Sequence, residues 1–224
     1  MEIFDLEAKN YDQWYDSKLG KFVDQVETEL AFKLFKPYPG MKVLDAGCGT
    51  GNFSLKLAEM GCQVIGIDIS EEMLKIAQTK IKPGLDLEFR LMDTYDLDFA
   101  DQEFDGVLSM AAFEFIYQPQ KAYDEMYRVL KPQGNLVIGT INLESKWGEF
   151  YLSDEIRENS VYKYADFKTL AALKSLNQKE VVGSGQCLFI PPTAKEDEIS
   201  LELEKELSEK EKGGFICVKW QKEA

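Results

Sequence analysis

Residues 43–51 read VLDAGCGTG, an apolar run that ends in an acid and is followed by three alternating glycines. Glycine permits a sharp strand-to-helix turn and lets a ligand touch the backbone where a Cβ atom would intrude. A turn kept small only for packing would show the same glycines. The nicotinamide and flavin fingerprint needs glycine or alanine at position 52, which is Asn52. The segment therefore predicts a ligand-binding loop, but not that fingerprint.

Acidic residues follow the next two apolar runs. Asp68 stands 21 positions after Gly47, where an open α/β sheet places an acid that can accept both hydroxyls of a ribose. It could instead cap a helix alongside Ser70. Asp93 could accept a hydrogen bond from an adenine amino group, although a solvated loop acid would look the same. Because such sheets bind ligands at their carboxyl edge, these strand ends together predict a binding site there.

Charge and composition exclude several classes of function. The chain has 26 Lys and Arg against 40 Asp and Glu, a net charge of -14 over 224 residues. Such a field repels phosphate backbones and anionic lipid, so we expect neither nucleic acid nor a membrane as partner. The chain has no histidine. Triads built on histidine are therefore excluded, and a proton acceptor must be a carboxylate, Tyr, Lys, Cys or water.

Cysteine spacing and hydropathy indicate the compartment. No C-x-x-C pair occurs among the four cysteines, Cys48, Cys62, Cys187 and Cys217. We therefore expect reduced thiols, no metal site and a cytoplasmic location. No apolar run reaches the roughly 18 to 20 residues that span a bilayer, and the acidic amino-terminus differs from a secretion signal.

These candidate residues must be positioned by alternating strands and helices. Apolar runs predict strands over residues 43–44, 64–67, 85–92, 104–110, 135–141, 181–190 and 215–220. Helices are expected over residues 53–59, 70–81, 122–130, 166–176 and 195–212, and before the prolines at 37 and 39. This alternation implies an α/β, doubly wound, mostly parallel sheet with helices on both faces. The direction of the last strand stays open, and residues 195–212 are expected to form a solvated amphipathic helix.

Several segments together resemble the class I S-adenosylmethionine-dependent methyltransferases, in particular the small-molecule branch that includes the ubiquinone and menaquinone biosynthesis enzymes. Residues 45–51 are similar to the first motif of that family. Residues 66–70, together with Met73, resemble its acidic second motif. Residues 92–94 resemble its adenine loop. Residues 128–134 resemble its R-x-L-K-P-G-G signature, with Gln133 in place of the first glycine. The resemblance covers roughly residues 8–142.

The resemblance implies a Rossmann-like methyltransferase fold with seven strands, amino-terminal helices and a helical cap. We expect a single domain over residues 1–224, with a lid at 1–36, a cofactor-binding core at 41–142, a cap that faces the substrate at 143–178, and carboxyl-terminal strands and a helix at 179–224. The residues implied to bind S-adenosylmethionine are Tyr11, Tyr15, Asp45, Gly47, Cys48, Gly49, Gly51, Asp68, Ile69, Met73, Asp93, Thr94 and Met110.

Glu114 is the only ionisable side chain of the segment after the fourth strand, which faces the reactive methyl group in related proteins. If neighbouring phenylalanines remove it from water, its pKa rises towards the range useful for a general base. A carboxylate that points to solvent or pairs with Lys or Arg is the alternative. An aromatic set in the cap could line a pocket or merely pack on the sheet: Trp147, Phe150, Tyr151, Tyr162 and Tyr164.

We therefore expect methyl transfer from S-adenosylmethionine to a small molecule by a monomer or homodimer. The alternative is a catalytically inactive S-adenosylmethionine-binding protein that acts as a sensor or partner. A nicotinamide-dependent oxidoreductase is the third interpretation, and the spacing at Asn52 argues against it.

Overall fold

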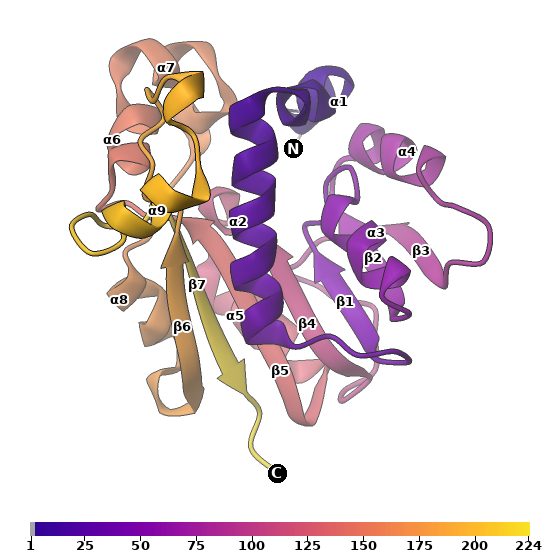
Figure 1. Ribbon diagram of the computed structural model, residues 1–224. Helices are drawn as coiled ribbons and strands as arrows, with labels where there is room; N and C mark the ends of the chain where they lie inside the picture. Colours follow the sequence, from indigo (N-terminus) through magenta and orange to yellow (C-terminus); the bar gives the residue numbers. More distant parts are fainter. Residues whose placement is uncertain (1–2) are drawn as a thin grey trace.

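The computed structural model describes residues 3–224 and contains one seven-stranded sheet with the order β3-β2-β1-β4-β5-β7-β6 (Figure 1). Its strands are β1 (Lys42–Ala46), β2 (Gln63–Asp68), β3 (Leu87–Leu91), β4 (Phe104–Met110), β5 (Leu130–Ile141), β6 (Val181–Cys187) and β7 (Phe215–Gln221). The strands from β3 to β5 pair in parallel, whereas β7 is antiparallel to both β5 and β6. The predicted fold class is confirmed. The direction of the last strand, which the sequence left undecided, is antiparallel.

The α-helices are α1 (Ile3–Tyr11), α2 (Lys18–Phe35), α3 (Asn52–Glu59), α4 (Glu71–Thr79), α5 (Pro119–Arg128), α6 (Lys146–Leu152), α7 (Asp154–Asn159), α8 (Leu170–Lys174) and α9 (Leu201–Leu207). Short 3-10 helices add η1 (Asp12–Asp16), η2 (Phe113–Phe115), η3 (Val161–Tyr164), η4 (Ser175–Glu180) and η5 (Glu196–Glu198). Several of the helices have a serine as their N-cap residue. Ser17 accepts from the N–H of Gly20 at α2, and Ser70 accepts from the N–H of Met73 at α4.

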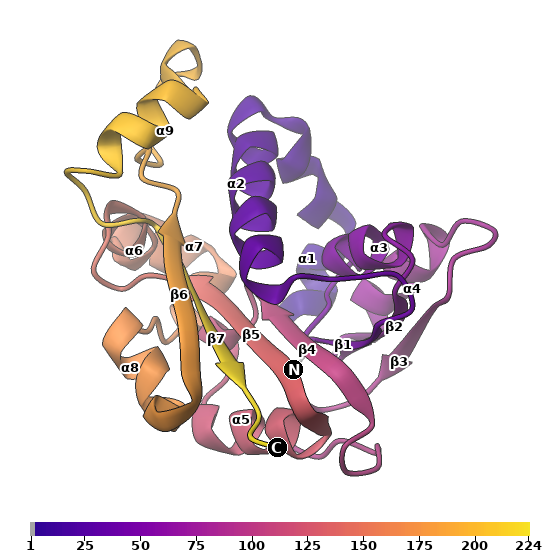
Figure 2. The ribbon, with the colours of Figure 1, turned by 60° about the horizontal axis from the view of Figure 1, so that its bottom comes forward.

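Both faces of the sheet are buried. Since successive side chains of a strand point to opposite faces, neighbouring residues of one strand pack in different clusters. Val43 of β1 lies in the cluster that includes α2 and α3, whereas its neighbour Leu44 lies in the cluster of α5 and α8. Figure 2 shows α2 and α3 on one side of the sheet and α5 on the other. The elements α1, α6 and α7 gather beyond the carboxyl ends of the parallel strands (Figure 1). The predicted lid and cap segments therefore meet at the edge where the chemistry is expected.

The charged segment 195–212 differs from its prediction. Only Leu201–Leu207 is α-helical, and Glu204 is buried. Its carboxylate accepts three backbone N–H groups, from Leu188 at 2.6 Å, Phe189 at 2.8 Å and Ile190 at 3.0 Å. These donors follow the end of β6, where no strand pairs with them, so a buried carboxylate supplies the missing acceptor. The prediction of a solvated amphipathic helix was wrong at this residue, because its carboxylate is buried. The helix expected over residues 166–176 is also shorter, spans Leu170–Lys174 and is capped by Thr169.

Candidate active site

The glycine loop between β1 and α3 takes left-handed backbone conformations that favour glycine. The φ angles are +76° at Gly47, +53° at Gly49 and +81° at Gly51. A Cβ atom at Gly47 would lie 2.6 Å from the Cβ atom of Ala112, so the chain itself requires glycine there. At Gly49 a Cβ atom would meet none of the atoms of residues 3–224 within 4 Å. The second glycine therefore faces open space, as expected of a loop that a ligand approaches.

Asp68 ends β2 and is tied to this loop. Its Oδ2 atom accepts the N–H of Gly49 at 2.8 Å, and its Oδ1 atom accepts the N–H of Ser70 at 2.9 Å. Burial raises the pKa of Asp68, although these N–H groups oppose the shift. The alternative role for Asp68 was a helix cap, but the N-cap residue of α4 is Ser70. Asp68 is thus held at the carboxyl edge with its remaining lone pairs available.

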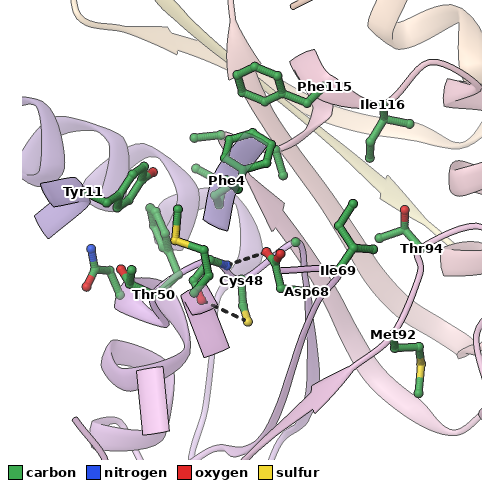
Figure 3. Close-up of a pocket in the computed structure, with 18 of the residues that line it drawn as sticks. Phe4, Tyr11, Cys48, Thr50, Asp68, Ile69, Met92, Thr94, Phe115 and Ile116 are labelled. Carbon is green, nitrogen blue, oxygen red and sulfur yellow. Dashed lines mark hydrogen bonds between the residues drawn. The ribbon is translucent and has the colours of Figure 1, made fainter. Parts of the chain in front are cut away.

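A first cavity opens at this edge, between the loop, the end of β2 and the residues after β3 and β4 (Figure 3). Of the residues predicted to bind the cofactor, it is lined by Tyr11, Tyr15, Gly47, Cys48, Gly49, Asp68, Ile69, Met73, Asp93, Thr94 and Met110. Sequence reasoning missed other residues of its wall, including Phe4, Thr50, Met92, Phe115 and Ile116. Met92 and Thr50 adjoin predicted residues in the sequence, and that adjacency could have found them.

Asp45 and Gly51, which the resemblance also implies as cofactor-binding residues, do not line this cavity. Asp45 is 1% exposed and accepts a hydrogen bond of 2.6 Å from the hydroxyl of Ser54 in α3. Burial raises the pKa of Asp45 to about 7. At Gly51 a Cβ atom would lie 2.6 Å from the ring of Phe89. Both residues therefore support the loop from beneath.

The far end of the first cavity is largely apolar. Ile69 is 44% exposed although it is a large aliphatic residue, and it lines the cavity together with Ile116. The two side chains face each other in the view of Figure 3. The Oδ1 atom of Asp93 accepts the N–H of Tyr95 at 2.9 Å, which leaves its Oδ2 atom for other donors. An apolar slot beside one free carboxylate oxygen suits a flat heteroaromatic ring with an amino group.

Cys48 also lines the first cavity, but its thiol has low reactivity. Burial raises the pKa of the Cys48 thiol, and the charges of Asp45 and Asp68 raise it further. A thiol with a raised pKa is a poor nucleophile, because the thiolate is the reactive form. Its small size is the property that the loop uses.

Residues of α1 and η1 cover the loop. The carboxylate of Asp12 accepts from the hydroxyl of Thr50 at 2.7 Å and pairs with the ammonium group of Lys80 at 2.6 Å. The hydroxyl of Ser70 donates to Asp5 in α1. The amino-terminal segment is therefore fastened both to the glycine loop and to α4, in the position that a lid would occupy.

A second cavity, of about 380 Å³, adjoins the first. Both share the wall residues Phe4, Tyr11, Tyr15, Ala111 and Phe115. Ala111 has a φ angle of +51°, a strained value for a residue with a Cβ atom, directly after β4. Of the aromatic set in the cap, Trp147, Tyr151 and Tyr162 line the second cavity, whereas Phe150 and Tyr164 do not. Three of the five rings therefore form part of a pocket.

Glu114 lines the second cavity from η2. It is 1% exposed, and its Oε2 atom accepts a hydrogen bond of 2.9 Å from the hydroxyl of Thr140 in β5. Within residues 3–224 it forms no salt bridge, so neither the solvated nor the paired alternative describes it. Burial raises the pKa of Glu114 to about 7.

Glu27 of α2 also lines this cavity, and sequence reasoning missed it. Burial raises the pKa of Glu27, and the charge of Glu114 raises it further. Helical periodicity was the available signal, because Glu27 stands four residues after the buried Val23 and next to the buried Val26.

An open, mostly parallel sheet with a glycine loop after β1 and an acid at the end of β2 defines the doubly wound proteins that bind nucleotides. Comparison with known proteins narrows the class. Residues 44–138 match the family described as the methyltransferase domain. Within residues 3–224, no helix is long and apolar enough to cross a membrane.

Three relatives illustrate the match. An uncharacterized protein of Methanocaldococcus jannaschii is 31% identical over 99% of this chain and 100% of its own length. The demethylmenaquinone methyltransferase of Clavibacter sepedonicus is 34% identical over 61% of this chain, a match that covers only 55% of that enzyme. A crystal structure from Thermotoga maritima, described as a SAM-dependent methyltransferase and possible histamine N-methyltransferase, has a TM-score of 0.75 at 25% identity. That alignment covers 99% of this chain and 98% of the other.

This chain belongs to the class I S-adenosylmethionine-dependent methyltransferases. The recognition made from the sequence motifs is thereby confirmed, as are the enzyme class and the cofactor.

Proposed function

We propose that this enzyme methylates a small molecule held in the second cavity, with S-adenosylmethionine in the first. The observation that carries the proposal is the junction of the two cavities at Ala111 and Phe115, which line both. A group bound in the second cavity would thus lie against the part of the first cavity that faces Met110. A volume of about 380 Å³ suits a small molecule rather than a folded partner.

The residues of the first cavity fit the cofactor. Asp68 would accept the ribose hydroxyls, and Asp93 with Thr94 would hold the adenine ring against Ile69. The open space beside Gly49 would take the amino-acid part, since no side chain of the described residues fills it. Cys48, Gly47, Met73 and Met110 would complete the wall, and Tyr11 and Tyr15 would close it from the lid.

When bound, the cofactor supplies an activated methyl group on a positively charged sulfur. The chain must then hold the acceptor in line with that group and keep water out. The lid contacts of Asp12 and the aromatic walls of the second cavity serve both purposes. In this proposal Glu114 takes a proton from the acceptor, which its position in the wall of the second cavity and its raised pKa support.

Further parts of the proposal concern the whole protein. We propose that residues 1–224 act as one methyltransferase domain and that the enzyme is a cytoplasmic monomer or homodimer. The four cysteines are free thiols, which supports a reducing compartment.

Incubation with S-adenosylmethionine and a pool of cell metabolites tests the function. We expect S-adenosylhomocysteine to accumulate together with a methylated product that mass spectrometry identifies. Tight binding of the cofactor without transfer to any metabolite fraction would favour the inactive sensor or partner. Titration with NADH, which we expect to leave its fluorescence unchanged, addresses the oxidoreductase.

A further inference from the structure

The second cavity carries two carboxylates and no compensating cation among residues 3–224. Glu27 enters from α2 and Glu114 from η2. No hydrogen bond or salt bridge from the described residues reaches the carboxylate of Glu27. Among the described residues, Glu114 has only the hydroxyl of Thr140 as a side-chain partner.

Two lysines influence these carboxylates from a distance, but each is paired elsewhere. Lys56 bonds Asp24 and the hydroxyl of Thr28. Lys168 pairs with Asp166 at 2.6 Å. Among the described residues, therefore, no cation pairs with either carboxyl group, and ionising both would leave negative charge that the surrounding protein does not neutralise.

Aromatic rings form much of the remaining wall. Tyr151 and Tyr162 pack with ring centroids 3.9 Å apart, and Trp147 lies 5.8 Å from Tyr151. The faces of such rings carry negative potential and attract cations that lie over them. The same rings supply apolar contact for a carbon skeleton.

We propose that the second cavity binds the protonated amine of a small apolar acceptor, with the ammonium group between Glu27 and Glu114 and the carbon skeleton against the aromatic wall. This inference rests on the proposed methyl transfer and names the class of its acceptor. An anionic acceptor would be repelled by both carboxylates. A neutral acceptor would supply no counter-charge, so ionising either carboxyl group beside it would be costly, in line with the raised pKa of both groups.

The same arrangement prepares the nitrogen for reaction. An ammonium nitrogen has no lone pair, so it must first pass one proton to the Glu114 carboxylate. The amine lone pair then forms the N–C bond with the methyl group, while the electron pair of the broken C–S bond stays on sulfur. The product is a methylated ammonium and a neutral thioether, and the proton on Glu114 leaves to solvent as the cavity opens.

Binding measurements with matched probes test the inference. Phenylalkylamines with one to four methylene groups and the alcohols of equal length are titrated calorimetrically into the protein saturated with S-adenosylhomocysteine. We expect at least one amine to bind more tightly than its alcohol by about tenfold or more, the value of one charge-assisted hydrogen bond. Equal affinities throughout the series, or no amine binding at all, would overturn the inference.

Variants locate the binding charge. Glu27→Gln should lower the affinity for the amine by about 10- to 150-fold and change the affinity for the alcohol by less than about threefold. The matched control is Glu29→Gln, on the same helix, whose exposed carboxylate bonds Gln25. This control should bind both probes as the wild type does. If both variants weaken the amine equally, a general charge effect replaces the specific contact.

The outcome is separable from the proposed function. Binding of S-adenosylmethionine and formation of S-adenosylhomocysteine with a metabolite pool are measured on the same samples. Transfer to an alcohol or an acid, but to no amine, would leave the methyl transfer intact and refute only the amine acceptor.

Discussion

Replacement of Gly49 by valine should separate the two demands that the loop places on glycine. Gly49 has a φ angle of +53°, and a Cβ atom there would meet no atom of the described part of the chain within 4 Å. The fold therefore has room for the side chain, whereas a ligand in the first cavity does not. Gly84, between α4 and β3, provides a matched control because it has a φ angle of +89° and equally open surroundings, yet lies outside the cavity.

The expected magnitudes follow from this comparison. A residue with a Cβ atom in the left-handed region costs about 1–2 kcal/mol, and both valine variants carry that cost. For a chain of this size the loss corresponds to a decrease in Tm of about 2–8 °C. Only Gly49→Val should also lose cofactor affinity, by more than about 100-fold or about 2.8 kcal/mol, because its side chain fills space that the ligand needs.

Thermal unfolding of the two free variants and calorimetric titration with S-adenosylmethionine give both quantities. Added cofactor should raise the Tm of Gly84→Val as it does that of the wild type, and should leave the Tm of Gly49→Val unchanged. Equal cofactor affinity in the two variants would refute the reasoning. Wholesale unfolding of Gly49→Val alone would show that the glycine serves packing instead.

Three further predictions address the remaining parts of the site. Asp68→Ala should lower the affinity for S-adenosylmethionine, measured by calorimetry, by roughly 10- to 150-fold, and unchanged affinity would remove Asp68 from the site. Hydrogen exchange over residues 8–23 should slow when cofactor is added, and Asp12→Ala, which releases Thr50 and Lys80, should reduce that protection. Glu114→Gln should lower kcat by about 10²- to 10⁴-fold with cofactor affinity intact, and a fall below tenfold would reject an essential base. Because burial raises the pKa of Glu114 to about 7, its folded carboxyl holds a proton that the unfolded one releases, so wild-type stability falls as the pH rises through 7. The Tm of Glu114→Gln relative to wild type should therefore rise between pH 5 and pH 8, and a constant difference would contradict the raised pKa of Glu114.

The core of the fold could be predicted because its signals are local. Each apolar run from β1 to β5 is bounded by a turn or a capped helix, and the strand over residues 104–110 has the same bounds in the structure. The parallel order follows from the alternation of strands and helices. Beyond β5 the elements depend on distant contacts instead. Glu204 shows this, since its three backbone donors lie more than ten residues away in the sequence.

Most of the residues predicted to bind the cofactor line the first cavity, since a motif names neighbours along the chain. A motif does not say which side of a turn each residue faces. Asp45 and Gly51 belong to the glycine segment, yet their partners are Ser54 and the ring of Phe89 beneath the loop. Only the backbone path, with three left-handed glycines in five residues, decides which atoms reach the ligand.

The second cavity was largely beyond prediction, because its walls come from the lid, α2, the residues after β4 and the cap. Glu27 illustrates the difficulty. Its periodicity places it near the buried face of α2, but a carboxylate at such a position usually pairs with a nearby cation or reaches solvent. Here the nearby Lys56 bonds Asp24 and Thr28, while Glu27 faces a cavity that also contains Glu114. Two carboxyl groups face one cavity only when α2 and η2 are brought together, and the cost of ionising both without a counter-charge is the reason to expect a cationic ligand between them.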